Sequence, residues 1–113
     1  MERSVVFICS PYAGDVNTNV ERAKRFLLYA IEQGVTPIAP HLLYPQVLDD
    51  AEDDAREQGM QMGYDLLHRC DGVWVLGPTV SEGMQEEVVR ALGSGMQVRY
   101  YRVLDDGSYG LEM

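Results

Sequence analysis

The sequence has few cysteines, almost no lysine and no long run of apolar residues. Its two cysteines, Cys9 and Cys70, are too few for a disulfide-stabilised scaffold, so we expect reduced thiols. No apolar run approaches the ~18 residues that a membrane-spanning helix needs. The first residues lead directly into an apolar run, without the pattern of a signal peptide. We therefore expect a cytoplasmic protein with no membrane partner.

Basic residues are scarce as well. Eighteen acidic side chains face nine basic ones, for a formal net charge of −9, and Lys24 is the only lysine. Proteins that bind nucleic acid draw much of their affinity from Lys and Arg that neutralise phosphates, so this balance argues against polymeric nucleic acid as a partner. A P-loop with its lysine is absent. A small anion stays compatible, because backbone amides at a helix N-terminus can hold a phosphate without lysine.

What the sequence does contain is enough for one folded domain. It has 113 residues, of which 46% are hydrophobic, and a chain of this size can bury a core of its own. We expect a single domain over residues 1–113, with 104–113 as a tail. Its predicted elements are strands at 4–9, 35–39, 71–77 and 97–103, helices at 18–33, 55–69 and 82–92, and a loop at 41–54. A capping box of Thr18 and Glu21 is expected to open the first helix.

The alternation of strands and helices predicts the fold class. We expect an α/β three-layer sandwich with a small parallel sheet of four to five strands, similar to flavodoxin or Rossmann folds. In such sheets, ligands bind beyond the carboxyl ends of the strands. This rule selects three places, which are residues 10–14, the pair Pro40-His41 and residues 77–87.

The segment 77–87 carries the sharpest signal. It leads from a strand into a helix N-terminus, where backbone amides point outward, and Gly83 lets a ligand approach the backbone closely. Glu86 and Glu87 point about 100° apart on a helix, so at most one of them can face a site squarely. Acidic residues in the first turns are also favourable for the helix alone, without any functional role.

Four segments together resemble the nucleoside 2-deoxyribosyltransferase superfamily, and its small bacterial and phage branch most closely. They are Cys9-Ser10-Pro11-Tyr12, Pro40-His41, Cys70-Asp71-x-Val73-Trp74-Val75 and Ser81-x-Gly83-Met84-x-x-Glu87-x-x-x-Ala91. Enzymes of this superfamily cleave N-glycosidic bonds of deoxynucleosides or their monophosphates, with a Glu six residues after a Ser or Asp as nucleophile.

The resemblance implies a role for each matching position. Glu87 would be the nucleophile, and the substrate would be a small-molecule nucleoside or nucleotide. The positions expected to bind it are Ser10, Pro11, Tyr12, His41, Ser81, Gly83 and Met84. The resemblance implies no cofactor and no metal, and it implies a homo-oligomer.

One position departs from the superfamily pattern. Its enzymes usually carry an Asp eight residues before the Asp that begins the third strand, and counting back from Asp71 that position is Gly63. The nearest carboxylate is Asp65, which we take as the second catalytic candidate. Two residues on a helix are about 200° apart, so Asp65 would point almost the opposite way. Tyr12 and His41 are alternatives for supplying the proton.

Two functions follow from these observations. The first is an N-glycosidic bond hydrolase or deoxyribosyltransferase with a Glu nucleophile; the alternative is a non-catalytic nucleotide-binding module, a sensor or sequestering protein, that uses the same pocket. A flavin-binding electron carrier is a weaker hypothesis, because the loop after the first strand lacks a run of hydroxyl residues. A zinc site is not expected either, because the cysteines and histidines lack paired ligand spacing.

Overall fold

The computed structural model describes residues 3–12, 14–49, 51–77 and 80–112. Its elements are, in chain order, β1 (Val5–Cys9), α1 (Val16–Glu32), β2 (Thr36–Ile38), η1 (Pro40–Leu42), η2 (Tyr44–Gln46), α2 (Asp53–Leu67), β3 (Gly72–Leu76), α3 (Glu82–Gly93), β4 (Gln97–Val103) and β5 (Tyr109–Glu112). Here η1 and η2 are short 3₁₀ helices. They lie in the first half of the segment that the sequence predicted as a loop.

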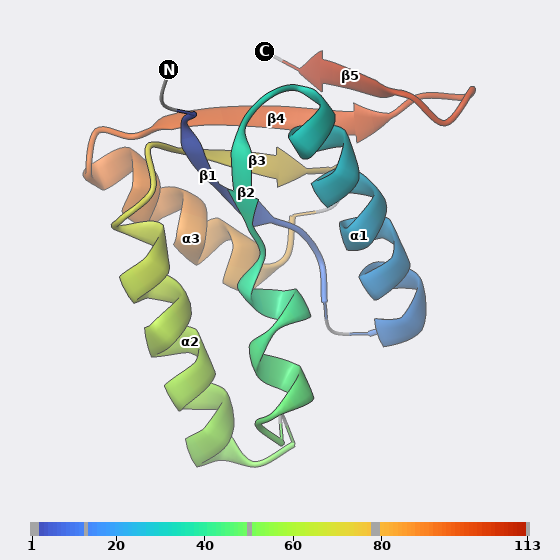
Figure 1. Cartoon of the computed structure of the whole chain (residues 1–113). Helices are drawn as coiled ribbons and strands as arrows, with labels where there is room; N and C mark the ends of the chain where they lie inside the picture. The colour runs from blue at the N-terminus through green and yellow to red at the C-terminus, as the bar shows by residue number, and fades with distance from the viewer. Residues whose placement is uncertain (1–2, 13, 50, 78–79, 113) are drawn as a thin grey trace.

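The five strands form one sheet in the order β2-β1-β3-β4-β5. The first four strands are parallel, and β5 returns antiparallel to β4. Helix α1 covers one face of the sheet, whereas α2 and α3 cover the other (Figure 1). This arrangement confirms the predicted three-layer α/β sandwich. Within the residues described, no helix is both long and apolar enough to cross a bilayer.

The prediction of a tail at 104–113 is wrong, because this segment forms a turn and a fifth strand. Residues 104–108 turn the chain, with the Leu104 amide donating to the Ser108 carbonyl at 2.7 Å, and Tyr109–Glu112 then forms β5. The Tyr109 ring lies 4.7 Å from the Tyr29 ring of α1, centroid to centroid. Burial against the aromatic side chains of α1 therefore gives this segment a reason to fold that its local sequence does not display.

The predicted start of the first helix, at residue 18, is also wrong. The helix begins at Val16, and its N-cap is Asp15 rather than a capping box of Thr18 and Glu21. The Asp15 carboxylate accepts hydrogen bonds from the Thr18 amide at 3.2 Å and from the Thr18 hydroxyl at 2.8 Å. These two bonds lower the pKa of Asp15 and satisfy a donor of the first turn.

The sheet separates two hydrophobic cores. Because side chains alternate along a strand, Val6 and Ile8 of β1 pack with Phe26 of α1, whereas Phe7 and Cys9 pack on the α2 and α3 side. Trp74 is 5% exposed and lies in the α1-side core. The core on the α2 and α3 side includes Cys9 at the carboxyl end of β1 and Met84 of α3. Both residues lie next to the site described below.

Phe26 of the α1-side core should contribute strongly to the stability of the fold. Phe26 is fully buried, whereas Leu28 on the same helix is 58% exposed. We expect Phe26→Ala to lower the free energy of unfolding by about 3–5 kcal/mol, and Leu28→Ala to change it by less than about 0.5 kcal/mol. Urea unfolding followed by circular dichroism measures both; similar losses in the two variants would contradict this packing.

Candidate active site at the carboxyl edge of the sheet

A cavity of about 1060 Å³ lies at the carboxyl edge of the sheet. The strand order runs from β1 to β2 in one direction and from β1 to β3 in the other, and ligands of open α/β sheets bind at such a switch point. Its lining comes from the segment after β1, from η1 and η2, from α2 and from the start of α3. The lining residues are Ser10, Tyr12, Pro40, His41, Tyr44, Pro45, Leu48, Ala55, Arg56, Gly59, Met60, Gly63, Tyr64, Ser81–Glu87 and Val89.

Most of the predicted site residues meet in this cavity. Those that line it are Ser10, Tyr12, His41, Ser81, Gly83, Met84 and Glu87. Pro11 and Asp65, which were predicted with them, are not among its lining residues. Segments up to 77 residues apart in the sequence therefore converge, as the strand-end rule predicts.

Glu87 is the buried carboxylate of the site, with 6% of its surface exposed. The Cys9 thiol donates a hydrogen bond to its Oε1 at 3.4 Å, and His41 Nε2 lies 3.9 Å from its Oε2. Burial and the nearby Glu87 charge raise the pKa of the Cys9 thiol far above its ordinary value. Cys9 is therefore a protonated donor to the carboxylate and not a nucleophile.

The 3₁₀ helix η1 and the segment after β1 position His41 together with Tyr12. Pro40 begins η1 with a fixed φ angle, and the His41 ring stacks on the Tyr12 ring at 5.8 Å between centroids. The Asn19 side chain on α1 donates to the Tyr12 carbonyl at 3.1 Å. The His41 side chain is 36% exposed, so it lies between the buried carboxylate and solvent.

The two adjacent acids of α3 have different environments. Glu86 is half-exposed, and its Oε1 pairs with Arg90 Nε at 3.2 Å, whereas Glu87 is buried. The Arg90 guanidinium lies over the Tyr64 ring of α2, 3.9 Å from its centroid, and burial raises the pKa of Tyr64. The sequence analysis did not identify Tyr64 as a residue that lines the cavity. The ion pair of Glu86 and Arg90 could have been predicted, because residues four apart on a helix lie on the same face.

Ser81 has a clear structural role at the start of α3. It is the N-cap, and its hydroxyl accepts a hydrogen bond from the Met84 amide at 3.3 Å. Met84 is almost fully buried beneath the cavity. A Cβ atom at Gly83 would meet no other atom within 4 Å, so protein packing does not require glycine there. Contact of these residues with a ligand stays a prediction.

The structure places the candidate catalytic acid Asp65 away from the other predicted site residues. Its side chain is exposed and lies outside the cavity lining, whereas Gly63, two residues earlier on α2, lines the cavity. The helix continues unbroken through both positions, so the angular separation of about 200° holds. A Cβ atom at Gly63 would meet nothing within 4 Å, which leaves room for a larger side chain.

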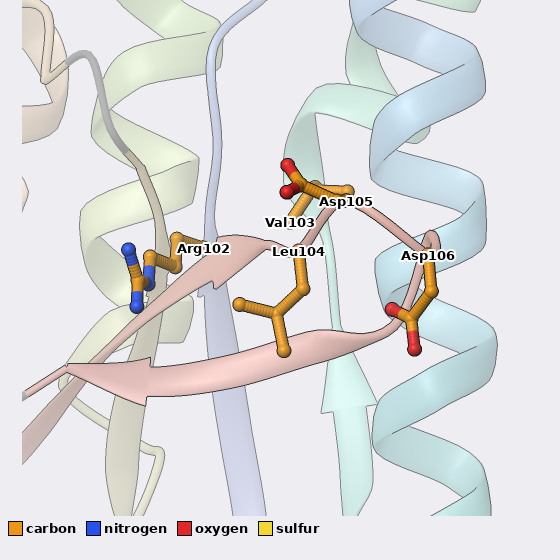
Figure 2. A pocket seen from close by; sticks show the side chains of 5 residues that line it. All are labelled: Arg102, Val103, Leu104, Asp105 and Asp106. Carbon is orange, nitrogen blue, oxygen red and sulfur yellow. The ribbon is translucent and has the colours of Figure 1, made fainter.

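A second, smaller hollow of about 410 Å³ lies at the β4–β5 hairpin (Figure 2). It is lined by five consecutive residues, 102–106, so no distant side chains converge there. Arg102 is already paired with Glu112 across the hairpin at 3.4 Å. Within the part of the chain that the structure describes, no group of three or more His, Cys, Asp and Glu could hold a metal ion. The larger cavity is therefore the candidate site.

Solved structures with the same fold include two 2-deoxyribosyltransferases. The enzyme from the psychrotolerant bacterium Bacillus psychrosaccharolyticus is 14% identical, with a TM-score of 0.68 over 90% of this chain and 74% of its own. The 2-deoxyribosyltransferase from Leishmania mexicana is also 14% identical, with a TM-score of 0.58 over 95% of this chain and 78% of its own. This similarity confirms the resemblance at the level of the fold.

No curated protein matches the sequence. The domain family DUF7768, which is described as a domain of unknown function, matches residues 4–101 and so includes every strand of the parallel part of the sheet in whole or in large part. The match also includes all residues that line the cavity. The chain therefore belongs to the DUF7768 family, and it has the fold of the 2-deoxyribosyltransferases.

Proposed function

We propose that this protein cleaves the N-glycosidic bond of a deoxynucleoside or its monophosphate, as a hydrolase or a deoxyribosyltransferase. The observation that carries the proposal is the buried Glu87 carboxylate, held between Cys9 and His41 in a cavity large enough for a nucleoside. The shared fold with two 2-deoxyribosyltransferases supports it. The homo-oligomer stays a prediction.

The chemistry is a double displacement at the anomeric carbon of the sugar. Glu87 Oε2 attacks that carbon, the bond to the base nitrogen breaks, and the electron pair leaves with the base. The product is a glycosyl ester on Glu87. Water or a second base then attacks the same carbon and releases the carboxylate, with net retention of configuration.

The departing base must accept a proton, and we propose that His41 supplies it. His41 Nε2 lies 3.9 Å from Glu87 Oε2. The nucleophile and the acid of retaining glycosidases are about 5–5.5 Å apart, so the half-exposed imidazole has to turn away from Oε2 to reach the departing base. Asp65 is outside the cavity lining and cannot take this role without a change in α2. After the base leaves, the neutral His41 accepts the proton of the water that resolves the ester.

The nucleophile has a matched control next to it in the sequence. We expect Glu87→Gln to reduce base release by at least about 1000-fold, because a neutral amide cannot form the glycosyl ester. Glu86→Gln should leave base release within about threefold, because Glu86, although it also lines the cavity, is half-exposed and has its carboxylate paired with Arg90. Chromatography of a panel of deoxynucleosides and deoxynucleotides after incubation measures both. Base release by the Glu87→Gln variant at the wild-type rate would refute the assignment.

The proton donor can be separated from the nucleophile by the leaving group. We expect His41→Gln to slow base release by about 100-fold or more, but to spare 4-nitrophenyl 2-deoxyriboside, whose phenolate leaves without protonation. Glu87→Gln should lose activity on both substrates. Asp65→Asn is the control and should keep its activity on both. Release of the base and of 4-nitrophenolate before the steady state tests this, because it reports the first step alone, before His41 is needed to activate water. Equal losses on both substrates in the His41→Gln variant would contradict a proton-donor role.

A non-catalytic nucleotide-binding module is the second candidate function. It is favoured by the glycine at position 63, which lines the cavity. Enzymes of the nucleoside 2-deoxyribosyltransferase superfamily, which this chain resembles, usually carry an Asp at that position. Without that acid the same cavity could hold a nucleotide and not turn it over. Tyr12 stacked on His41 would then serve as a platform for the base.

Restoring the acid distinguishes the two functions. If the protein is a binding module, the wild type should bind a nucleotide in calorimetry without releasing base, and Gly63→Asp should confer base release, since the position has open space. Gly59→Asp, one turn earlier on the same helix and also at the cavity, is the control and should stay inert. Base release by the wild type would exclude the binding module. If the Gly63→Asp variant binds the nucleotide but releases no base, the missing acid is not the reason for the lack of turnover.

A further inference from the structure

The carboxyl end of β1 contacts the candidate nucleophile directly. Cys9 is fully buried, and its Sγ lies 3.4 Å from Glu87 Oε1 and 3.7 Å from the Met84 carbonyl oxygen. The contact joins residues 78 positions apart in the chain, across the interface between the sheet and α3. The sequence alone predicted only that the Cys9 thiol is reduced.

The direction of this hydrogen bond is fixed by its surroundings. Both neighbours of the thiol, the Glu87 carboxylate and the Met84 carbonyl, are acceptors, so the proton must lie on sulfur. A carboxylate that is removed from water is costly unless it receives hydrogen bonds. The thiol supplies one on the side of the sheet, where water has no access.

The bond makes the two oxygens of Glu87 inequivalent. Oε1 is held by the sheet through Cys9, and Oε2 is the oxygen that faces His41. We propose that Cys9 is a positioning residue, whose thiol fixes the rotation of the Glu87 carboxylate so that Oε2 is presented to the sugar. The proposal rests on the proposed function, because it gives Oε2 the role of attacking atom.

A thiol suits this role better than a stronger donor. It is a weak hydrogen-bond donor, so it orients the carboxylate without withdrawing as much electron density from it as a charged or amide donor would. It is also apolar enough to pack with Phe7, Val75 and Met84 in the core on the α2 and α3 side of the sheet. One side chain therefore fills the core and orients the site.

The second cysteine of the chain is a built-in control. Cys70 is half-buried, donates to the Leu66 carbonyl at 3.2 Å and is not among the cavity-lining residues. Burial raises the pKa of Cys70 to about 11, so both thiols are protonated at neutral pH. Each should therefore give an S–H stretching band in the infrared, assigned by its loss in Cys9→Ala or in Cys70→Ala.

The first test measures the bond itself, independently of turnover. We expect the Cys9 S–H band to move to higher frequency in Glu87→Gln, because a neutral amide is a weaker acceptor than a carboxylate. The Cys70 band should not move. An unchanged Cys9 band would overturn the proposal. This comparison needs the wild type, Glu87→Gln and, for the assignment of the two bands, Cys70→Ala, so it decides the matter even if Cys9→Ala fails to fold.

The second test measures the effect on the reaction. Cys9→Ala should lower kcat for base release by about 10- to 100-fold, since a small misplacement of a reacting atom has effects of that size, with KM within about threefold. Cys9→Ser retains a donor, although a stronger one, and should recover part of kcat, and Cys70→Ala should match the wild type. Equal effects of Cys9→Ala and Cys70→Ala, or of Cys9→Ala and Cys9→Ser, would overturn the proposal. A wild type with no base release would refute the proposed function, and the infrared shift would still decide the bond.

Discussion

The candidate site depends on the burial of one carboxylate. Glu87 lies where water is largely excluded, so the elements around it must supply what solvent no longer does. Strand β1 provides the thiol of Cys9, and η1 provides the imidazole of His41. These groups meet only because β1 pairs with β3 in a register that places Cys9 beside Val75, directly in front of the loop that leads into α3. The site geometry is thus a property of the sheet.

Much of the fold follows from local patterns, and the exceptions share a cause. Continuous apolar runs are typical of buried parallel strands, which is why β1 and β3 were predicted close to their observed places. Strand β5 was missed because Tyr109 is stabilised by Tyr29, 80 residues earlier in the chain. The N-cap of α1 was misplaced because Asp15 and Thr18 are both good capping residues, and only the backbone geometry decides between them.

The site shows the same division between local and distant information. Helix geometry alone separates Glu86 from Glu87 and places Asp65 away from Gly63, and the structure agrees with both. The partners of Glu87 could not be ranked from the sequence, because their distances depend on how β1, η1 and α3 pack. The lining by Tyr64 and Arg56 on α2 likewise depends on the angle at which that helix crosses the sheet.

The two cores on opposite faces of the sheet divide the chain into parts that are free to change in different ways. Substitutions on the α1 side, around Phe26 and Trp74, lie behind the sheet from Glu87, so that core can drift in sequence while the site keeps its shape. Strand β1 has no such freedom, because neighbouring residues such as Ile8 and Cys9 face different cores. A single inserted residue within it would exchange the faces of the strand. The geometry of the site is therefore more sensitive to the length of β1 than to the composition of the α1-side core.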